Sequence, residues 1–480
     1  MNLISGILAS PFRALRTPAN RPKSFVPRLE SLEARALFAN LLVTGLDGAF
    51  GSTVGPDGNL YVTEQIAGRI SRVNPHTGQV TTFASGLPSD SPYAGLGGGV
   101  MDLAFIDNIA YVLTAAVGPS YEGGNARDVV GIYRIDSPTS STVIANLGAW
   151  SAANPPPPDF EIFDPNGAQY AMQPYRGGFL VTDGHHNRVV HVTLDGQITQ
   201  LLQFGNVVPT GLEVRGNTVY LSQAGPVPHK PETGKLLSFT PGSTAAPKLV
   251  ASGAPLLVDV ELGPGNTLFA LSQGYFSGGA GMEGYPADPD TGSLVRVNAD
   301  GTFNIVDTGL DRPTSLEFIG NTAYVTGLGG QIVTIDVSRR PTDVVLGGGR
   351  AVLTDPNGKS FGATFALAAV RRANGSADGF VDFTFGPAFG QQWSTVSGVD
   401  RIQLQGKITS FTVAADGTIV LEGRLTQKEF KRGRLVFAER DVPFRIVIGP
   451  NSTGVSLTWN DLPTFELEVS RGGLRNLRIR

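Results

Sequence analysis

Short apolar runs separated by turns recur along residues 40–338 of this 480-residue chain. In the clearest unit, Leu60 to Thr63 is an apolar and β-branched run, and Arg69 to Val73 alternates polar and apolar residues. Short runs of this kind, bounded by Gly, Pro and Asn turns, predict antiparallel strands. With one strand before them (49–54) and one after (79–84), the unit has four strands, the size of one propeller blade.

The unit recurs along the chain, and its second strand returns at intervals of 50, 69, 40, 49 and 55 residues. The copies are Ala110-Tyr111-Val112, Phe179-Leu180-Val181, Val219-Tyr220-Leu221, Leu268-Phe269-Ala270 and Ala323-Tyr324-Val325. A period of roughly 40–50 residues with four strands per unit predicts blades around a central axis. We therefore expect six blades.

The last blade lacks a fourth strand after Ile335-Asp336-Val337, whereas Asn40 to Leu46 matches the closing strand of other blades. We expect this N-terminal strand to complete the sixth blade and so close the ring. Closure of this kind hides a sheet edge that would otherwise recruit other chains.

The blade period stops at Arg339 to Thr342, which we interpret as a domain boundary. Seven further strands are predicted beyond it, at 351–353, 363–370, 380–385, 401–413, 418–425, 442–448 and 465–469. The expected fold is therefore all-β, with a six-bladed β-propeller over 40–339 and a small antiparallel β-sandwich or barrel over 345–480.

Composition narrows the function. Residues 40–339 carry 13 Lys/Arg against 26 Asp/Glu, so the propeller is acidic and lacks the basic footprint of a nucleic-acid-binding protein. The chain has no cysteine, which excludes disulfides and thiolate metal sites. It also has no apolar run of 18 residues, so no membrane span is expected.

Residues 1–39 are interpreted as a leader outside the fold. The stretch Arg28 to Ala39 resembles the RLxLExLExRxLL leader of large exported proteins in planctomycete bacteria. Its alternative interpretation is a short amphipathic helix. The resemblance implies export to the periplasm, the cell surface or the extracellular space.

Residues 40–338 resemble the ScyD/ScyE family of NHL-like propellers. The resemblance is carried by GPDGNLYVTE…GRISRVNPHTGQVTTFASGLPS in the first unit, and by Val208 to Leu212 and Pro313 to Leu316 at later blade openings. It implies an exported six-bladed propeller and transfers no established catalytic residue. Gly347 to Gly349, Ser360 to Phe365 and Leu474 to Ile479 similarly resemble the accessory domain called post-COAP.

Carboxylates on inner strands are the candidate site residues. Asp102, Glu161 and Asp259 interrupt apolar inner-strand runs, and Glu64 and Asp183 end second strands. Oxygen ligands converging on the axis would suit calcium, the one cofactor considered. The alternative is that these residues line a water-filled channel. The segment Asp183 to Arg188, with His185 and His186, matches the turn of NHL repeats, and a metal or acid-base role for the histidines is the alternative.

Two functions follow from these patterns. The favoured one is an exported, non-catalytic binding or scaffold protein whose long loops, between the second and third strands of several blades, recognise a protein, a glycan or a small molecule. The alternative is a calcium-dependent hydrolase of the gluconolactonase or strictosidine-synthase-like type that uses the central channel.

Overall fold

The computed structural model describes residues 39–89, 98–121, 124–157, 164–227, 233–276, 286–338, 343–371, 375–394, 396–414, 416–450, 454–460 and 462–469. The predicted leader before Ala39, the candidate Glu161 and the predicted boundary Arg339 to Thr342 lie outside these residues, as does the terminal stretch of the post-COAP resemblance. No helix among the described residues is long and apolar enough to cross a membrane.

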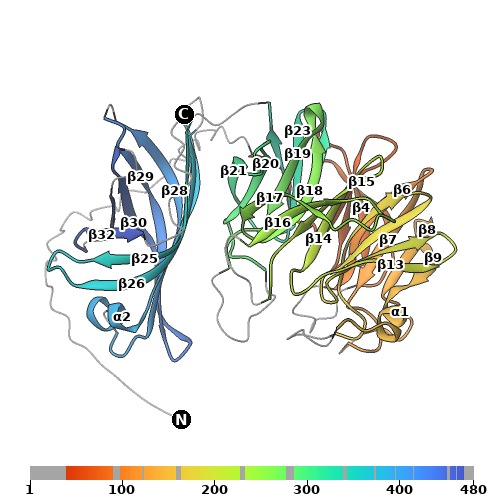
Figure 1. Ribbon diagram of the computed structural model, residues 1–480, viewed down its shortest axis with the longest axis horizontal. Helices are drawn as coiled ribbons and strands as arrows, with labels where there is room; N and C mark the ends of the chain where they lie inside the picture. The colour runs from red at the N-terminus through yellow and green to blue at the C-terminus, as the bar shows by residue number, and fades with distance from the viewer. Residues whose placement is uncertain are drawn as a thin grey trace, which may run out of the picture. The chain divides into compact units, whose positions relative to one another are not determined.

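Six four-stranded antiparallel sheets form the propeller, and each sheet is one blade (Figure 1). The first three are β2 (Ala49–Val54), β3 (Leu60–Glu64), β4 (Arg69–Val73), β5 (Val80–Ser85); β6 (Gly99–Ile106), β7 (Ile109–Ala115), β8 (Gly131–Ser137), β9 (Ser140–Asn146); and β10 (Gln169–Tyr175), β11 (Gly178–Asp183), β12 (Arg188–Thr193), β13 (Ile198–Gln203). Helix α1 (Leu147–Ala153) follows β9 and is capped by the Asn146 side chain.

The remaining blades complete the ring. They are β14 (Pro209–Arg215), β15 (Thr218–Gln223), β16 (Gly234–Phe239), β17 (Lys248–Ala254); β18 (Leu257–Gly263), β19 (Thr267–Ser272), β20 (Gly292–Val297), β21 (Phe303–Leu310), with the 3₁₀ turn η1 (Pro264–Asn266) before β19; and β22 (Pro313–Ile319), β23 (Thr322–Gly327), β24 (Gln331–Asp336). The fourth strand of the last blade is β1 (Ala39–Val43), which pairs with β24 as the sequence predicted.

The propeller core lies between neighbouring blades, because the second strand of each blade is largely buried. All five residues of β3 and all six of β11 are buried. Aromatic contacts join blades: Tyr61 of β3 packs edge-on against Phe105 of β6 with ring centroids 4.9 Å apart, and Tyr111 of β7 lies 5.0 Å from Phe179 of β11. Such packing fixes the inner strands of the ring rigidly.

The C-terminal domain is a closed eight-stranded antiparallel barrel, so of the two predicted arrangements the barrel is correct (Figure 1). Its elements are β25 (Asp343–Thr354), β26 (Ser360–Arg371), β27 (Ala377–Phe385), α2 (Pro387–Trp393), β28 (Arg401–Val413), β29 (Ile419–Lys431), β30 (Arg434–Ile448), β31 (Val455–Trp459) and β32 (Phe465–Val469). Stacked aromatic rings fill its interior; for example, the Phe385 and Phe389 centroids are 4.3 Å apart. The interior is a packed core.

Candidate functional site

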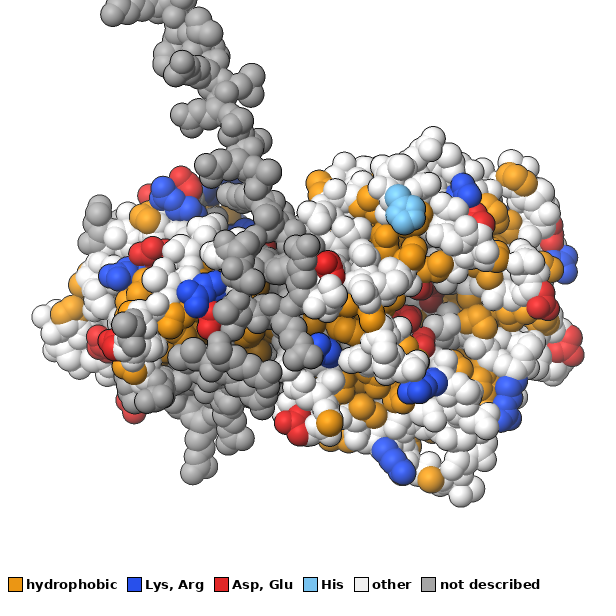
Figure 2. Space-filling view, turned by 90° about the horizontal axis from the view of Figure 1, so that it is seen from above, with side chains coloured by type: hydrophobic (Ala, Val, Ile, Leu, Met, Phe, Trp, Pro, Cys, Tyr) orange, Lys and Arg blue, Asp and Glu red, His pale blue; other side chains and the backbone are white. Residues whose placement is uncertain are grey.

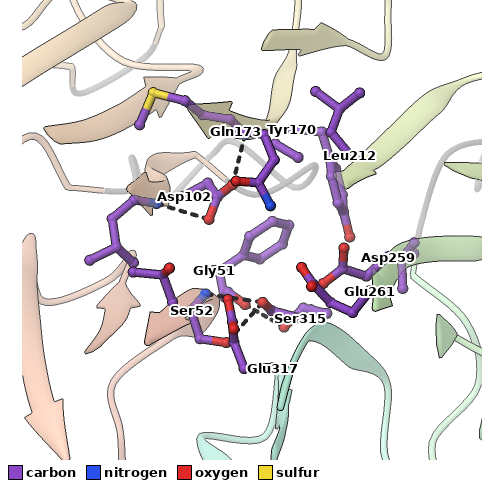
Figure 3. A pocket seen from close by; sticks show the side chains of 17 residues that line it. Gly51, Ser52, Asp102, Tyr170, Gln173, Leu212, Asp259, Glu261, Ser315 and Glu317 are labelled. Carbon is purple, nitrogen blue, oxygen red and sulfur yellow. Dashed lines mark hydrogen bonds between the residues drawn. The ribbon is translucent and has the colours of Figure 1, made fainter. Parts of the chain in front are cut away.

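The inner strands of the six blades, β2, β6, β10, β14, β18 and β22, surround a cavity at the centre of the propeller (Figure 3). The space-filling view shows acidic side chains recessed in a hollow of the propeller (Figure 2). Among the described residues that line the cavity there is no Lys, Arg or His. Its volume is ≈ 30 Å³, room for about two water molecules, whereas pockets for small organic ligands usually enclose about 300–1,000 Å³.

Asp102 and Asp259, both predicted as site residues, lie in this channel and have the same role. Asp102 Oδ1 accepts a hydrogen bond from the N–H of Leu103 (2.8 Å), and its Oδ2 accepts one from Met172 in the next blade (2.7 Å). Asp259 repeats this arrangement with Val260 and Leu316, both at 2.8 Å. Each carboxylate therefore uses one oxygen on the N–H of the next residue of its own strand and the other to hold the inner strand of the following blade.

A glycine in the preceding blade makes room for each of these aspartates. A Cβ on Gly51 would lie 2.6 Å from Asp102 Oδ1, and a Cβ on Gly211 would lie 2.4 Å from Asp259 Oδ1. The order glycine, aspartate, N–H donor thus occurs over blades 1 to 3 and again over blades 4 to 6. The channel has approximate two-fold symmetry at this level.

Three glutamates, which the sequence analysis did not single out, break this symmetry. Glu213, Glu261 and Glu317 occupy equivalent positions of three consecutive inner strands, opposite Tyr220, Phe269 and Tyr324 of their neighbouring second strands. The corresponding residues of the other three blades are neutral: Thr53, Ala104 and Gln173. The blade-opening alignment contained this signal, because Glu213 and Glu317 each follow a Gly/Ser-Leu pair.

Burial among like charges raises the pKa of every channel carboxyl group. Loss of hydration is the main cause in each case. It raises the pKa of Asp259 and of Glu213 to about 7, and raises those of Asp102, Glu261 and Glu317 well above their usual range. The N–H bonds of Met172 and Leu316 oppose the effect on the two aspartates. Part of this cluster is therefore protonated near neutral pH.

Tyr170 completes the channel wall. Its ring packs edge-on against Phe50 with centroids 5.2 Å apart, and its buried hydroxyl makes no hydrogen bond to the protein. Burial raises the pKa of this phenol well above its usual value, and the charges of Asp259 and Asp102 add to the effect. The hydroxyl is thus a neutral group on the channel wall.

Glu64 and Asp183, the other two candidates among the described residues, form ion pairs away from the cavity lining. Glu64 is fully buried and accepts hydrogen bonds from Arg69 at 2.7 Å to each oxygen. Asp183 lies 3.2 Å from the guanidinium of the buried Arg188. In both blades the acid ends the second strand and the arginine begins the third, which closes the connecting turn.

The His185-His186 segment forms the expected turn. His186 is buried, with Nε2 2.7 Å from the carbonyl oxygen of Asp164 and Nδ1 2.7 Å from Arg188 Nη2. Because arginine can only donate, Nδ1 accepts and Nε2 carries the proton. Asn187, in the left-handed region at φ 53°, accepts hydrogen bonds from the N–H groups of Val207 and Val208. The turn is held by these bonds on both sides.

Carboxylates and histidines of the described residues do not assemble a metal centre. No group of three or more His, Cys, Asp or Glu side chains among them could hold a metal ion. Asp102 and Asp259 stand on opposite sides of the ring, in blades 2 and 5, and each of their oxygens accepts a hydrogen bond from a backbone N–H. The third predicted ligand, Glu161, is outside the described residues.

One end of the propeller carries the long connections. The links between second and third strands span residues 116–130, 224–233 and 273–291, and the link from β9 to β10, on the same end, spans 147–168. Side chains hold them: Tyr121 donates to Asp164 at 2.6 Å. Asn206, in the link from β13 to β14 (204–208), accepts a hydrogen bond from the N–H of Val227 and donates one to its C=O. The opposite end has tight turns, such as the two residues between β6 and β7.

Comparisons with known proteins return structural neighbours that are distant from this chain. No protein-family model and no curated protein matches the chain. Similar solved structures are β-propellers, and three examples each cover 62% of this chain. They include the PQQ-bound aldose sugar dehydrogenase of Streptomyces coelicolor (TM-score 0.43, 15% identity, 96% of that chain covered).

A second is a calcium-binding regucalcin of Agrobacterium tumefaciens (TM-score 0.41, 12% identity, 92% of that chain covered). A third is a virginiamycin B lyase of Staphylococcus aureus (TM-score 0.37, 14% identity, 97% of that chain covered). Similarities this distant carry no argument about activity.

Proposed function

We propose that this chain is an exported, non-catalytic binding protein of the ScyD/ScyE type, in which a rigid propeller presents its long-loop end to a partner. The observation that carries the proposal is the use of the central carboxylates. Asp102 and Asp259, the residues best placed to hold a catalytic cation, each use both oxygens on backbone N–H groups of the ring. These hydrogen bonds give both carboxylates a structural role.

The size of the channel supports the same conclusion. The central cavity of ≈ 30 Å³ is far smaller than the pockets of about 300–1,000 Å³ that usually hold small organic ligands. The long-loop end, by contrast, offers exposed polar side chains on a fixed support, such as Arg127 and Asp290. Binding surfaces are commonly built in this way.

Calcium titration of the full chain, with a panel of lactones and esters, tests the non-catalytic part of the proposal. We expect neither stoichiometric calcium binding nor turnover. Calcium binding that disappears in Asp259→Asn, together with lactone hydrolysis, would establish the calcium-dependent hydrolase instead.

A glycan array and capture of extracellular proteins test the binding part. Arg127→Ala, at the long-loop end, is expected to weaken any captured interaction at least tenfold. Arg176→Ala, in the tight turn between β10 and β11 at the opposite end, is the matched control and is expected to leave it unchanged. Equal effects of the two variants would place binding elsewhere. Export is tested separately, by locating the full chain in cell fractions.

A further inference from the structure

The outer face of the C-terminal barrel carries a pocket that is distinct from the central channel. Along β27, β28 and β29, alternate side chains fill the barrel core, as Val381, Leu404 and Leu425 do, and those between them face outward. Six outward residues lie in two cross-strand rows, Asp382-Gln405-Thr426 and Phe380-Lys407-Arg424. With Lys428 and residues 289–291 of the link between β19 and β20, they line a pocket of ≈ 380 Å³, a usual size for a site that holds a small organic ligand.

Asp382 is a buried acid in this pocket, and one of its oxygens has no partner. The residue is 1% exposed. Its Oδ2 accepts hydrogen bonds from the side-chain amides of Gln405 at 2.9 Å and Gln403 at 3.3 Å. Its buried Oδ1 accepts none from the described residues. Buried acceptors are rarely left without a donor, so Oδ1 is the atom to which a ligand would donate.

Three cationic side chains, Lys407, Arg424 and Lys428, share the pocket with this acid. Lys428 Nζ donates to Gln405 Oε1 at 2.6 Å, and Arg424 Nη1 donates to the carbonyl oxygen of Asp441 at 2.9 Å. Within the described part of the chain, the ammonium of Lys407 makes no hydrogen bond or ion pair. The pocket therefore presents an unpaired cation and an unpaired acceptor on neighbouring strands.

These two groups select a ligand that carries both a negative charge and a hydrogen-bond donor. A hydroxyl suits Asp382 better than an ammonium does, because Lys428 already lies one side chain away, on the Gln405 that binds Asp382. The neutral Thr426 and the buried ring of Phe380 add a hydroxyl and an apolar surface. A carboxylate on the same molecule would pair with Lys407.

We propose that this barrel pocket binds a sugar acid, with a ring hydroxyl donating to Asp382 Oδ1 and the carboxylate pairing with Lys407. A free sugar acid and a unit of an acidic polysaccharide share this chemistry. The site goes beyond the proposed binding surface of the long loops, because both recognition residues lie on barrel strands and the propeller contributes only residues 289–291.

Saturation-transfer NMR and isothermal titration of the full-length chain test the site, with D-glucuronate and D-galacturonate as probes. Burial raises the pKa of Asp382 to about 7, so the experiment is done at pH 8, where the ionised carboxylate can only accept. We expect at least one of the two uronates to bind with a millimolar Kd. It should bind about fivefold more tightly than glucose, which lacks the carboxylate, and than hexanoate, which lacks hydroxyls.

The variant Lys407→Gln should abolish the preference for the uronate over glucose and leave glucose binding unchanged. Lys431→Gln is the matched control, because Lys431 is exposed at the end of β29 and lies outside the pocket lining. It should keep the wild-type preference. Asp382→Asn should weaken both sugars, because its amide oxygen would stay with the two glutamines and its nitrogen, a donor, would replace Oδ1. Lys407→Gln decides the question should Asp382→Asn fold poorly.

The proposal would be overturned if neither uronate binds, if the wild type binds uronate and glucose equally, or if Lys407→Gln keeps the wild-type preference. Tighter binding of L-serine than of both uronates would also overturn it, since an ammonium would then be the donor. Oligogalacturonate that binds about tenfold more tightly than its monomer would support a polysaccharide as the source, and equal affinity would support a free sugar acid. Arg127→Ala, which tests the long-loop end, should leave uronate binding unchanged, so the two proposals fail separately.

Discussion

The Oδ2 atom of Asp102 accepts a hydrogen bond of 2.7 Å from the backbone N–H of Met172, and so a side chain of blade 2 holds the inner strand of blade 3. The same bond joins Asp259 to Leu316 half a turn around the ring. Asp102 and Asp259, which the sequence analysis considered as cation ligands, thus join neighbouring blades by hydrogen bonds. Substitutions that remove or crowd these hydrogen bonds are therefore expected to destabilise the propeller.

Replacing Asp102 by Asn should destabilise the propeller. The amide nitrogen cannot accept a hydrogen bond, so one of the N–H groups of Leu103 and Met172 loses its partner in a buried site. We expect the free energy of unfolding to fall by about 1–2 kcal/mol, measured by urea denaturation. Asp107→Asn, in the exposed turn that follows β6, is the control and should show no measurable change. If both variants unfold at the same urea concentration as the wild type, the fastening role is wrong.

Gly211→Ala should be among the most disruptive small substitutions in the ring. The added Cβ would lie 2.4 Å from Asp259 Oδ1 and 2.6 Å from its Cα, so the two inner strands must separate. We expect a cost of about 1–3 kcal/mol in a chemical denaturation experiment. Gly205→Ala has nothing within 4 Å of the new Cβ and should be neutral or slightly stabilising. A neutral Gly211→Ala would mean that the strands are less tightly packed than described.

Arg69→Gln should destabilise blade 1 in a pH-dependent manner. Burial acts to raise the pKa of Glu64, but hydrogen bonds from Arg69, Ser71 and the Asp47 N–H outweigh it and lower the pKa below its ordinary value. The pair therefore stabilises the fold above pH 4.5, and the stabilisation is lost as the pH falls through the lowered pKa. This is the opposite sign to the channel carboxyl groups, whose pKa values burial raises.

We expect a loss of about 1–2 kcal/mol at pH 7, below the usual figure for a fully buried pair because the Arg69 side chain is 36% exposed. The difference from wild type should shrink towards pH 3 in thermal melts. Arg72→Gln, which removes an ion pair in which both partners are exposed, should change nothing measurable at either pH. A loss that stays constant with pH would contradict the assignment.

Removing β1 should open the ring. A chain that begins at Ala39 keeps all of β1, whereas one that begins at Asp47 leaves β24 as an unpaired edge and loses the hydrogen bond from the Leu46 N–H to the Gly330 carbonyl. We expect the shorter chain to aggregate, because exposed edges recruit other strands. Light scattering and size-exclusion chromatography measure this. Two equally monodisperse chains would show that closure does not depend on β1.

The periodic part of the fold was predictable from local pattern. Strand boundaries of the first blade were predicted to within a residue or two, because each strand there is short and ends at a Gly, Pro or Asn turn. The elements of the C-terminal barrel were harder to predict from the sequence. The strand Val455–Trp459 and the helix Pro387–Trp393 were missed, since neither shows a turn-bounded alternating pattern, and packing against the aromatic core decides both.

The channel residues likewise divide into those that the sequence pattern marked and those that it did not. A lone Asp within an apolar run marked Asp102 and Asp259, whereas Glu213, Glu261 and Glu317 resembled ordinary outward-facing residues of alternating strands. Glu64 and Asp183 were candidate channel residues because they end second strands, yet each forms an ion pair with an arginine five residues later. A linear pattern records alternation, but it does not record which face turns toward the axis.

The sequence by itself determined the all-β class, the number of blades and the closure by the N-terminal strand, because strands and turns are specified by neighbouring residues. Only the tertiary structure decided the chemistry of the centre. Carboxylates separated by about 50 residues meet there, and whether they bind a cation, a proton or a backbone N–H depends on distances that exist only once the ring has closed.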